Sequence, residues 1–210
     1  MDAVEVTADA EQFTCNAYLV PGDPPVLVDV GTMPGVEAVV REHVDELGAV
    51  VLTHQHSDHV GELDAVLDAF DPTPELLAYG DHPRRTRALA DGDHVGIGGE
   101  SFEVVYTPGH AADHVALVGE TTVFSGDVVV YDDGAFDDGS FGRTDMPGQS
   151  RERLIESLRT LLDRLPETVT TLYAGHGDVY RPGEGDDSVR EVIERALARA
   201  ERREPKYPDE

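Results

Sequence analysis

Histidine and aspartate occupy four of the six consecutive positions from His54 to His59. The segment follows a continuous apolar run, Ala49–Thr53, which predicts a buried strand. His54, His56 and Asp58 are spaced by two, so an extended backbone directs their side chains to one side. Imidazole and carboxylate are the usual protein ligands of zinc, iron and manganese. One isolated histidine would more often be a core residue, but four ligand-type residues at this spacing predict a metal site.

Three later motifs share the same setting, a ligand-type residue just after a predicted strand. Thr107–His110 ends in histidine, Ser125–Asp127 ends in aspartate, and Gly175–Gly177 has His176 at its centre. Each motif contains glycine, which lets the backbone turn sharply and bring a side chain close to a shared point. Loops at sheet edges commonly carry functional sites. Together with the first segment, the three motifs favour a site with several metal ligands.

Alternating and continuous apolar runs predict the strands that must position these residues. They are Val4–Ala8, Cys15–Val20, Val26–Val30, Ala49–Thr53, Leu76–Tyr79, Phe102–Thr107, Val115–Val118, Thr121–Phe124 and Val169–Tyr173. Helical spacing predicts helices at Pro34–Leu47, Gly61–Phe70, His82–Leu89, Ser150–Leu165 and about 186–204, the last one short and charged. Residues 131–150 predict a long loop, which in a compact domain is often functional. This mixture of strands and helices favours sheets covered by helices, in one domain that spans residues 1–210.

The charge of the chain is strongly negative. It has 210 residues with 16 Lys+Arg against 43 Asp+Glu, a formal net charge of −27. Binding to nucleic acid or to an anionic membrane needs clustered basic residues, so neither is expected as a partner. Self-repulsion at this charge destabilises a compact chain in low salt, and salt screens it. The composition therefore predicts a protein adapted to a very salty cytosol.

The single cysteine, Cys15, excludes an internal disulfide framework. The chain does not open on a basic segment followed by an apolar one, and no apolar run approaches the ~18 residues of a membrane span. A cytoplasmic location is therefore expected.

The motifs together resemble the metallo-β-lactamase superfamily, from Asn16 to Gly177. The residues that carry the resemblance, in chain order, are Leu27–Gly31, His54–His59, Thr107–His110, Ser125–Asp127 and Gly175–Gly177. The resemblance implies an α/β (α+β) fold, the four-layer αβ/βα sandwich, in which two β-sheets lie face to face and are flanked by helices.

The resemblance also implies a ligand set for two divalent metal ions, with zinc favoured and iron or manganese as alternatives. His54, His56 and His110 would hold one ion, and Asp58, His59 and His176 the other; Asp127 would bridge both. Asp29 and His114 match family positions that support the ligands from behind.

The segment Gly139–Gly148 is similar to a loop of small glyoxalase II-like hydrolases and of the related persulfide dioxygenases. Arg143 in this loop is a candidate for binding an anionic substrate group, and an ion pair with an acid such as Asp145 is the alternative. Many zinc β-lactamases have cysteine where this chain has Asp127, so lactam hydrolysis is not expected. The acidic residues after His176 differ from the basic glutathione-binding region of larger glyoxalase II enzymes, so the thiol portion of the substrate stays open.

The predicted function is a dinuclear metal-dependent hydrolase, similar to glyoxalase II, that cleaves a small-acyl thioester. The resemblance implies attack by a metal-bound hydroxide, with Asp58 and Asp127 as the catalytic carboxylates. A mononuclear iron persulfide dioxygenase is the alternative, weakened by Phe141 where those enzymes have cysteine. A non-enzymatic metal-binding protein is the second alternative. The oligomeric state is left open.

Overall fold

The computed structural model describes residues 2–183 and 186–204. The chain divides into two compact units, Met1–Ala90 with Val95–Ser101, and Asp91–His94 with Phe102–Glu210. Among the described residues, no helix combines the length and the apolar character that crossing a bilayer requires. The assignment of residues 1–210 to one domain stays a prediction.

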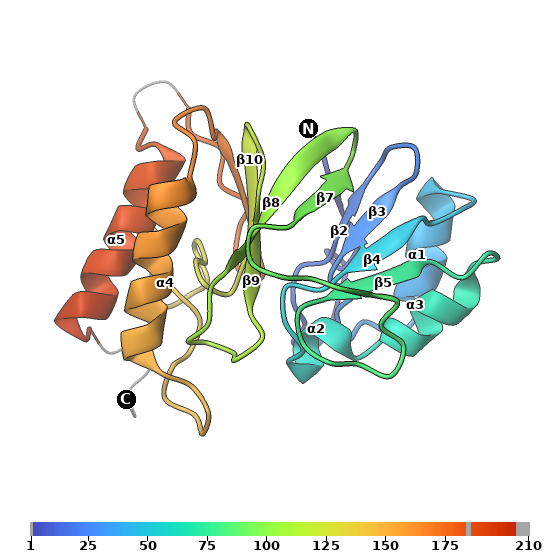
Figure 1. Cartoon of the computed structure of the whole chain (residues 1–210), viewed down its shortest axis with the longest axis horizontal. Helices are drawn as coiled ribbons and strands as arrows, with labels where there is room; N and C mark the ends of the chain where they lie inside the picture. The colour runs from blue at the N-terminus through green and yellow to red at the C-terminus, as the bar shows by residue number, and fades with distance from the viewer. Residues whose placement is uncertain (1, 184–185, 205–210) are drawn as a thin grey trace. The chain divides into compact units, whose positions relative to one another are not determined.

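The first unit contains a mixed six-stranded sheet in the order β1-β2-β3-β4-β5-β6. Its strands are β1 (Val4–Glu5), β2 (Tyr18–Val20), β3 (Val26–Val28), β4 (Ala49–Val51), β5 (Glu75–Ala78) and β6 (Arg87–Ala88). Its helices are α1 (Val36–His43), α2 (Ser57–Val60) and α3 (Leu63–Ala69). The strands from β3 to β6 run parallel, and β1, β2 and β3 are antiparallel. Figure 1 shows this sheet with α1 and α3 beside it.

The parallel pair β3 and β4 positions the first motif residues. Val28 is in register with Val51, so both strands end at the same edge of the sheet. Asp29 follows β3 directly and donates its backbone N–H to the carbonyl of Val51 over 2.9 Å. Buried apolar residues such as Leu27 anchor these strands in the core of the unit. The loops that carry Asp29 and the His54–His59 segment therefore start next to each other.

The second sheet is also mixed and has five strands in the order β11-β10-β9-β8-β7. Its strands are β7 (His94–Ile97), β8 (Glu100–Tyr106), β9 (Val115–Val118), β10 (Thr122–Gly126) and β11 (Thr171–Ala174). The helices of the second unit are α4 (Arg151–Arg164) and α5 (Val189–Arg202). The strands β10 and β11 are parallel and both end at one edge, where Gly175 donates its N–H to the carbonyl of Gly126 over 2.9 Å. This pairing brings the residues that follow, Asp127 and His176, to the same edge.

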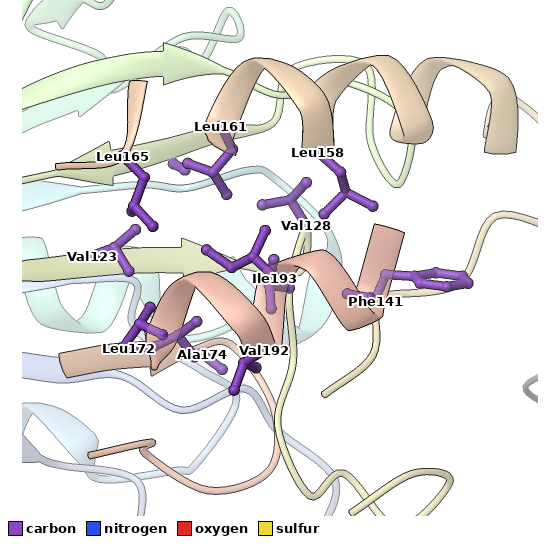
Figure 2. Packing of buried hydrophobic residues seen from close by; sticks show 14 of the residues in the cluster. Val123, Val128, Phe141, Leu158, Leu161, Leu165, Leu172, Ala174, Val192 and Ile193 are labelled. Atoms are coloured by element: carbon purple, nitrogen blue, oxygen red, sulfur yellow. The ribbon is translucent and has the colours of Figure 1, made fainter. Parts of the chain in front are cut away.

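The core of the second unit lies between its helices and strands (Figure 2). Leu158 of α4, Ile193 of α5 and Leu172 of β11 all belong to this cluster and are fully buried. Each buried side chain of this size contributes about 1.5–3 kcal/mol through removal of apolar surface from water. The amphipathic patterns of α4 and α5 thus fix both helices on the unit that carries Asp127.

The helix predicted at His82–Leu89 is wrong. The backbone N–H of Thr86 bonds to the carbonyl of Leu76, and that of Leu89 bonds to the carbonyl of Ala78, both over 3.0 Å. The segment therefore adds the short edge strand β6 to β5. A helix of two turns is marginal by itself, so pairing with a preformed sheet edge prevails.

The other helices are shorter at their ends than the sequence predicts. The charged terminal helix, expected at about 186–204, is α5 and begins at Val189. Ser188 caps it, because its side chain accepts the N–H of Glu191 while the Glu191 carboxylate accepts the N–H of Ser188. The strand β7 was not predicted, since its apolar alternation spans only His94–Ile97.

Candidate metal centre

The first unit carries one group of predicted site residues, called here the His54–His59 cluster. It consists of Asp29, His54, His56, Asp58 and His59. The buried His54 has its Nε2 atom 3.1 Å from Nδ1 of His56. The ring centroids of His54 and His59 are 4.0 Å apart. Three imidazoles from one short segment thus lie against one another.

Asp29 orients the ring of His59. Its carboxylate accepts the backbone N–H of Thr53 over 2.8 Å and the Thr53 hydroxyl over 2.7 Å. Its Oδ2 atom also lies 2.9 Å from Nδ1 of His59, which has no exposed surface. The carboxylate oxygen accepts in this bond, so the ring proton lies on Nδ1 and Nε2 carries the lone pair that could bind a metal. That Nε2 atom is 4.0 Å from Oδ2 of Asp58.

The backbone at Asp29 takes a conformation that brings its carboxylate to this position. Asp29 has a φ of 56°, in the left-handed region. Aspartate is among the few non-glycine residues that visit this region readily. The turn at the end of β3 therefore aims the side chain toward the His54–His59 segment.

The second unit carries the other group of predicted site residues, called here the Asp127 cluster. It consists of His110, His114, Asp127, Arg143 and His176. Oδ2 of Asp127 lies 3.2 Å from Nε2 of His110 and 3.4 Å from Nε2 of His176. Asp127 and His110 are buried, whereas the His176 side chain is partly accessible. One carboxylate oxygen and two ring nitrogens thus converge within this unit.

The hydrogen bonds of His110 fit a metal ligand. Its Nδ1 atom is 2.8 Å from the backbone carbonyl of Arg143. A carbonyl only accepts, so Nδ1 carries the proton and the neutral ring has its lone pair on Nε2. That lone pair faces the carboxylate of Asp127, and such close electron-rich atoms are stabilised by a proton or a cation between them. The donor set of nitrogen and carboxylate oxygen suits zinc, iron or manganese.

His114 contacts the same aspartate through the backbone. The N–H of Asp127 donates to Nε2 of His114 over 2.9 Å, so this nitrogen is an acceptor. Nδ1 of His114 then carries the proton and lies 2.8 Å from the hydroxyl of Thr107. Both ring nitrogens are engaged in this tautomer, which makes His114 a support for Asp127 rather than a ligand.

Arg143 has its guanidinium group paired with a neighbour. Its Nε and Nη2 atoms donate to the two carboxylate oxygens of Asp145 over 2.9 and 2.7 Å. This hydrogen bonding lowers the pKa of Asp145 below its ordinary value. The ion pair is the alternative that the sequence left open, and the substrate-binding role of Arg143 stays a prediction. The backbone of Arg143, in contrast, contacts a predicted ligand, His110.

Several supporting residues were not predicted. Thr53 and Thr107 hold Asp29 and His114, and the N–H of Gly142 donates to the carbonyl of Asp127 over 2.7 Å. The two threonines share a signal that could have revealed them, since each one ends a predicted strand directly before a ligand motif. The contact of Gly142 has no comparable local signal.

Known proteins resemble this chain in sequence and in structure. The hydroxyacylglutathione hydrolase of Vibrio cholerae serotype O1 is 32% identical over 154 residues, which are 71% of this chain and 56% of that protein. The chain thus spans about half the length of this relative. TTHA1623, solved in a di-iron-bound form, is 29% identical with a TM-score of 0.66, covering 86% of this chain and 94% of that one.

ETHE1 from Myxococcus xanthus has the same fold. It is 22% identical with a TM-score of 0.71, and the match covers 100% of this chain and 94% of that one. Two mixed sheets with flanking helices match these structures, which confirms the predicted fold class. The family model described as Metallo-beta-lactamase superfamily matches residues 10–176, and the chain therefore belongs to this superfamily.

Proposed function

We propose that the protein is a dinuclear metal-dependent hydrolase that cleaves a small-acyl thioester. The residues proposed to bind two divalent cations are His54, His56, Asp58, His59, His110, Asp127 and His176. The observation that carries the proposal is the way two of these rings are held. His59 and His110 are each fixed through Nδ1, by Asp29 and by the carbonyl of Arg143, which leaves Nε2 for a cation.

Divalent cations held by these residues would supply an activated water near neutral pH and would polarise the carbonyl of the thioester. The protein's own groups orient these partners. Asp127 offers an oxygen to the rings on either side of it, and His114 holds its backbone. Asp58 has a carboxylate oxygen near His59 Nε2 and is proposed to accept a hydrogen bond from the attacking water.

The name of the Vibrio cholerae relative supports a thioester substrate of the glyoxalase II type. The di-iron form of TTHA1623 supports a site for two cations, and iron as well as zinc belongs in the test. The guanidinium of Arg143 is paired with Asp145, so an anionic group of the substrate would bind Arg143 in competition with this carboxylate.

A residue of the second unit, Phe141, supports the hydrolase more than the alternative persulfide dioxygenase. Phe141 stands where the resembling dioxygenases have cysteine, and its ring is buried with the guanidinium carbon of Arg151 4.8 Å from its centroid. A large apolar side chain in the core cannot replace the chemistry of a thiol. The net charge of −27 supports a small-molecule partner and a salty cytoplasm over binding to nucleic acid.

The test measures metal content and turnover on one sample in high salt. We expect two divalent cations per chain and hydrolysis of small thioesters. His56→Ala should lose most of the activity while the circular dichroism spectrum stays unchanged, and His43→Ala on the exposed face of α1 is the matched control. One iron per chain with oxygen uptake on a persulfide would establish the dioxygenase instead. Bound metal without turnover on thioesters, lactones or persulfides would indicate a binding protein.

A further inference from the structure

Three arginines from the two helices of the second unit contact one loop. Arg151 lies on α4, and Arg195 and Arg199 lie on α5, which runs beside α4 (Figure 1). All three contact residues 136–144, the part of the long loop that approaches the Asp127 cluster. We call these residues the clamped loop.

Arg199 makes the most extensive contact with the clamped loop. Its guanidinium carbon lies 4.2 Å from the ring centroid of Phe136, and its Nη2 atom is 2.6 Å from a carboxylate oxygen of Asp138. Its Nη1 atom donates to the backbone carbonyl of Gly139. Only 12% of the Arg199 side chain is exposed, so water screens this ion pair less than it screens a surface pair.

Arg195 and Arg151 hold the two sides of the same loop. Nη1 of Arg195 donates to the carbonyl of Asp138 over 2.6 Å, and its Nε atom lies 3.3 Å from the Asp138 carboxylate. Nε of Arg151 donates to the hydroxyl of Thr144 over 2.8 Å. The contacts reach backbone carbonyls as well as side chains, so they set the path of the main chain.

The main chain between these contacts touches two proposed ligands. The N–H of Gly142 bonds to the carbonyl of Asp127, and the carbonyl of Arg143 accepts Nδ1–H of His110. A Cβ atom on Gly142 would lie 2.6 Å from Nδ1 of His110 and 2.8 Å from Cβ of Asp127. A small displacement of the clamped loop therefore changes the orientation of both side chains.

We propose that Arg195 and Arg199 are positioning residues that hold the clamped loop and thereby set the affinity of the Asp127 cluster for a cation. The inference rests on the proposed function in one respect, that His110 and Asp127 bind the cation. It assigns to helix α5 a role in the metal site. The contacts described for Arg195 and Arg199 are with the clamped loop, so both would act on the ligands through this loop.

The experiment uses the full chain, first free of metal. In Arg199→Ala we expect the amide of Gly142 to exchange with solvent about 10-fold faster, because the loop opens without global unfolding. The Nδ1–H signal of His110 in a nitrogen-edited NMR spectrum should broaden or disappear, since its acceptor moves. The dissociation constant for Zn²⁺ should rise about 10-fold, the range seen when partners of ligands are removed.

Two further variants separate the clamp from a general loss of structure. Arg159→Ala removes an exposed pair with Glu201 between α4 and α5, makes none of the loop contacts above, and should leave all three readouts at wild-type values. Arg199→Lys keeps the positive charge but loses the planar fork, so part of the zinc affinity should return relative to Arg199→Ala. Should Arg199→Ala be unfolded, Arg199→Lys is the test, with an expected rise of about 3-fold in Gly142 exchange.

Unchanged exchange at Gly142 together with an unchanged His110 signal, in whichever of the two variants is folded, would overturn the clamp. An equal response in Arg159→Ala would overturn it too, because the effect would then belong to helix packing. A wild-type chain that binds no cation would contradict the proposed function. The exchange and NMR measurements are made without metal, so they would still show whether Arg199 holds the clamped loop.

Discussion

Asp29 and His59 are 30 positions apart in the chain, yet their side chains lie 2.9 Å apart and are almost fully buried. The carboxylate of Asp29 also accepts two hydrogen bonds from Thr53. Both carboxylate oxygens of Asp29 therefore accept hydrogen bonds in the interior of the protein. This relationship fixes both the orientation and the tautomer of His59.

Asp29→Asn is expected to weaken metal binding by about 10- to 100-fold. The amide has one acceptor oxygen and must direct its NH₂ group either toward Thr53 or toward His59. Facing His59, the NH₂ group would favour the tautomer with its proton on Nε2, which cannot bind a cation. The dissociation constant for Zn²⁺, measured by calorimetry, checks this outcome.

Asp64→Asn is the control for the Asp29 variant. Asp64 lies in the same unit and pairs with Arg84, but 79% of its side chain is exposed. It should bind zinc as the wild type does. Equal zinc affinity in Asp29→Asn and in the wild type would contradict a role for Asp29 in orienting His59.

Gly142→Ala is expected to destabilise the protein and to reduce metal binding. The new Cβ atom would stand 2.8 Å from the carbonyl oxygen of Asp127 and closer still to His110. Overpacking of this kind lowers the free energy of unfolding by about 1–3 kcal/mol. Urea unfolding and zinc titration measure the two effects. Gly96→Ala, where a Cβ atom would meet nothing within 4 Å, should be neutral, and a neutral Gly142→Ala would show that the loop gives way freely.

The pair of Asp91 and Arg164 makes stability depend on pH. The guanidinium of Arg164 donates to both carboxylate oxygens over 2.9 and 2.8 Å and lowers the pKa of Asp91 below its ordinary value. The folded state therefore binds fewer protons than the unfolded state in this range. The stabilisation is present above the unfolded pKa and is lost as the pH falls through the folded pKa.

Asp91→Asn should accordingly lose less stability than the wild type when the pH falls from about 5 to about 2.5. The difference should stay below about 1 kcal/mol, because both side chains of the pair are partly exposed. Urea unfolding at a series of pH values measures it. Glu194→Gln, an exposed acid on α5, is the comparison, and parallel pH profiles for Asp91→Asn and the wild type would refute the prediction.

The melting temperature is expected to rise with salt. The chain has a net charge of −27, and its acidic groups repel one another. The range of this repulsion, the Debye length, is about 10 Å at 0.1 M salt and falls to about 3 Å at 1 M. Thermal unfolding in 0.1 M and in 2 M KCl, about 20-fold apart in ionic strength, checks this expectation. Sucrose in place of KCl separates charge screening from the general effect of excluded solutes. An equal melting temperature at both salt concentrations would remove the proposed adaptation to a salty cytosol.

Local patterns determined which segments carry the ligand-type residues. His54 and His56 follow a buried apolar run, and Asp127 and His176 follow two others, so strand ends and motif positions could be read from neighbouring residues. The same patterns, with the family resemblance, predicted the superfamily and fold class that the comparisons confirm. They failed at His82–Leu89, where an edge strand replaces the helix because the free edge of β5 supplies the hydrogen-bond partners.

Tertiary structure alone decided the partners of the side chains. The carbonyl of Arg143 accepts from His110 33 positions away, and Arg199 on α5 reaches the carbonyl of Gly139 60 positions away. Whether Arg143 is paired, which nitrogen of His114 carries the proton, and how α5 contacts the loop were equally open. The physical reason is that a hydrogen bond depends on distance and angle, and chain segments far apart in sequence acquire these only when the core has packed.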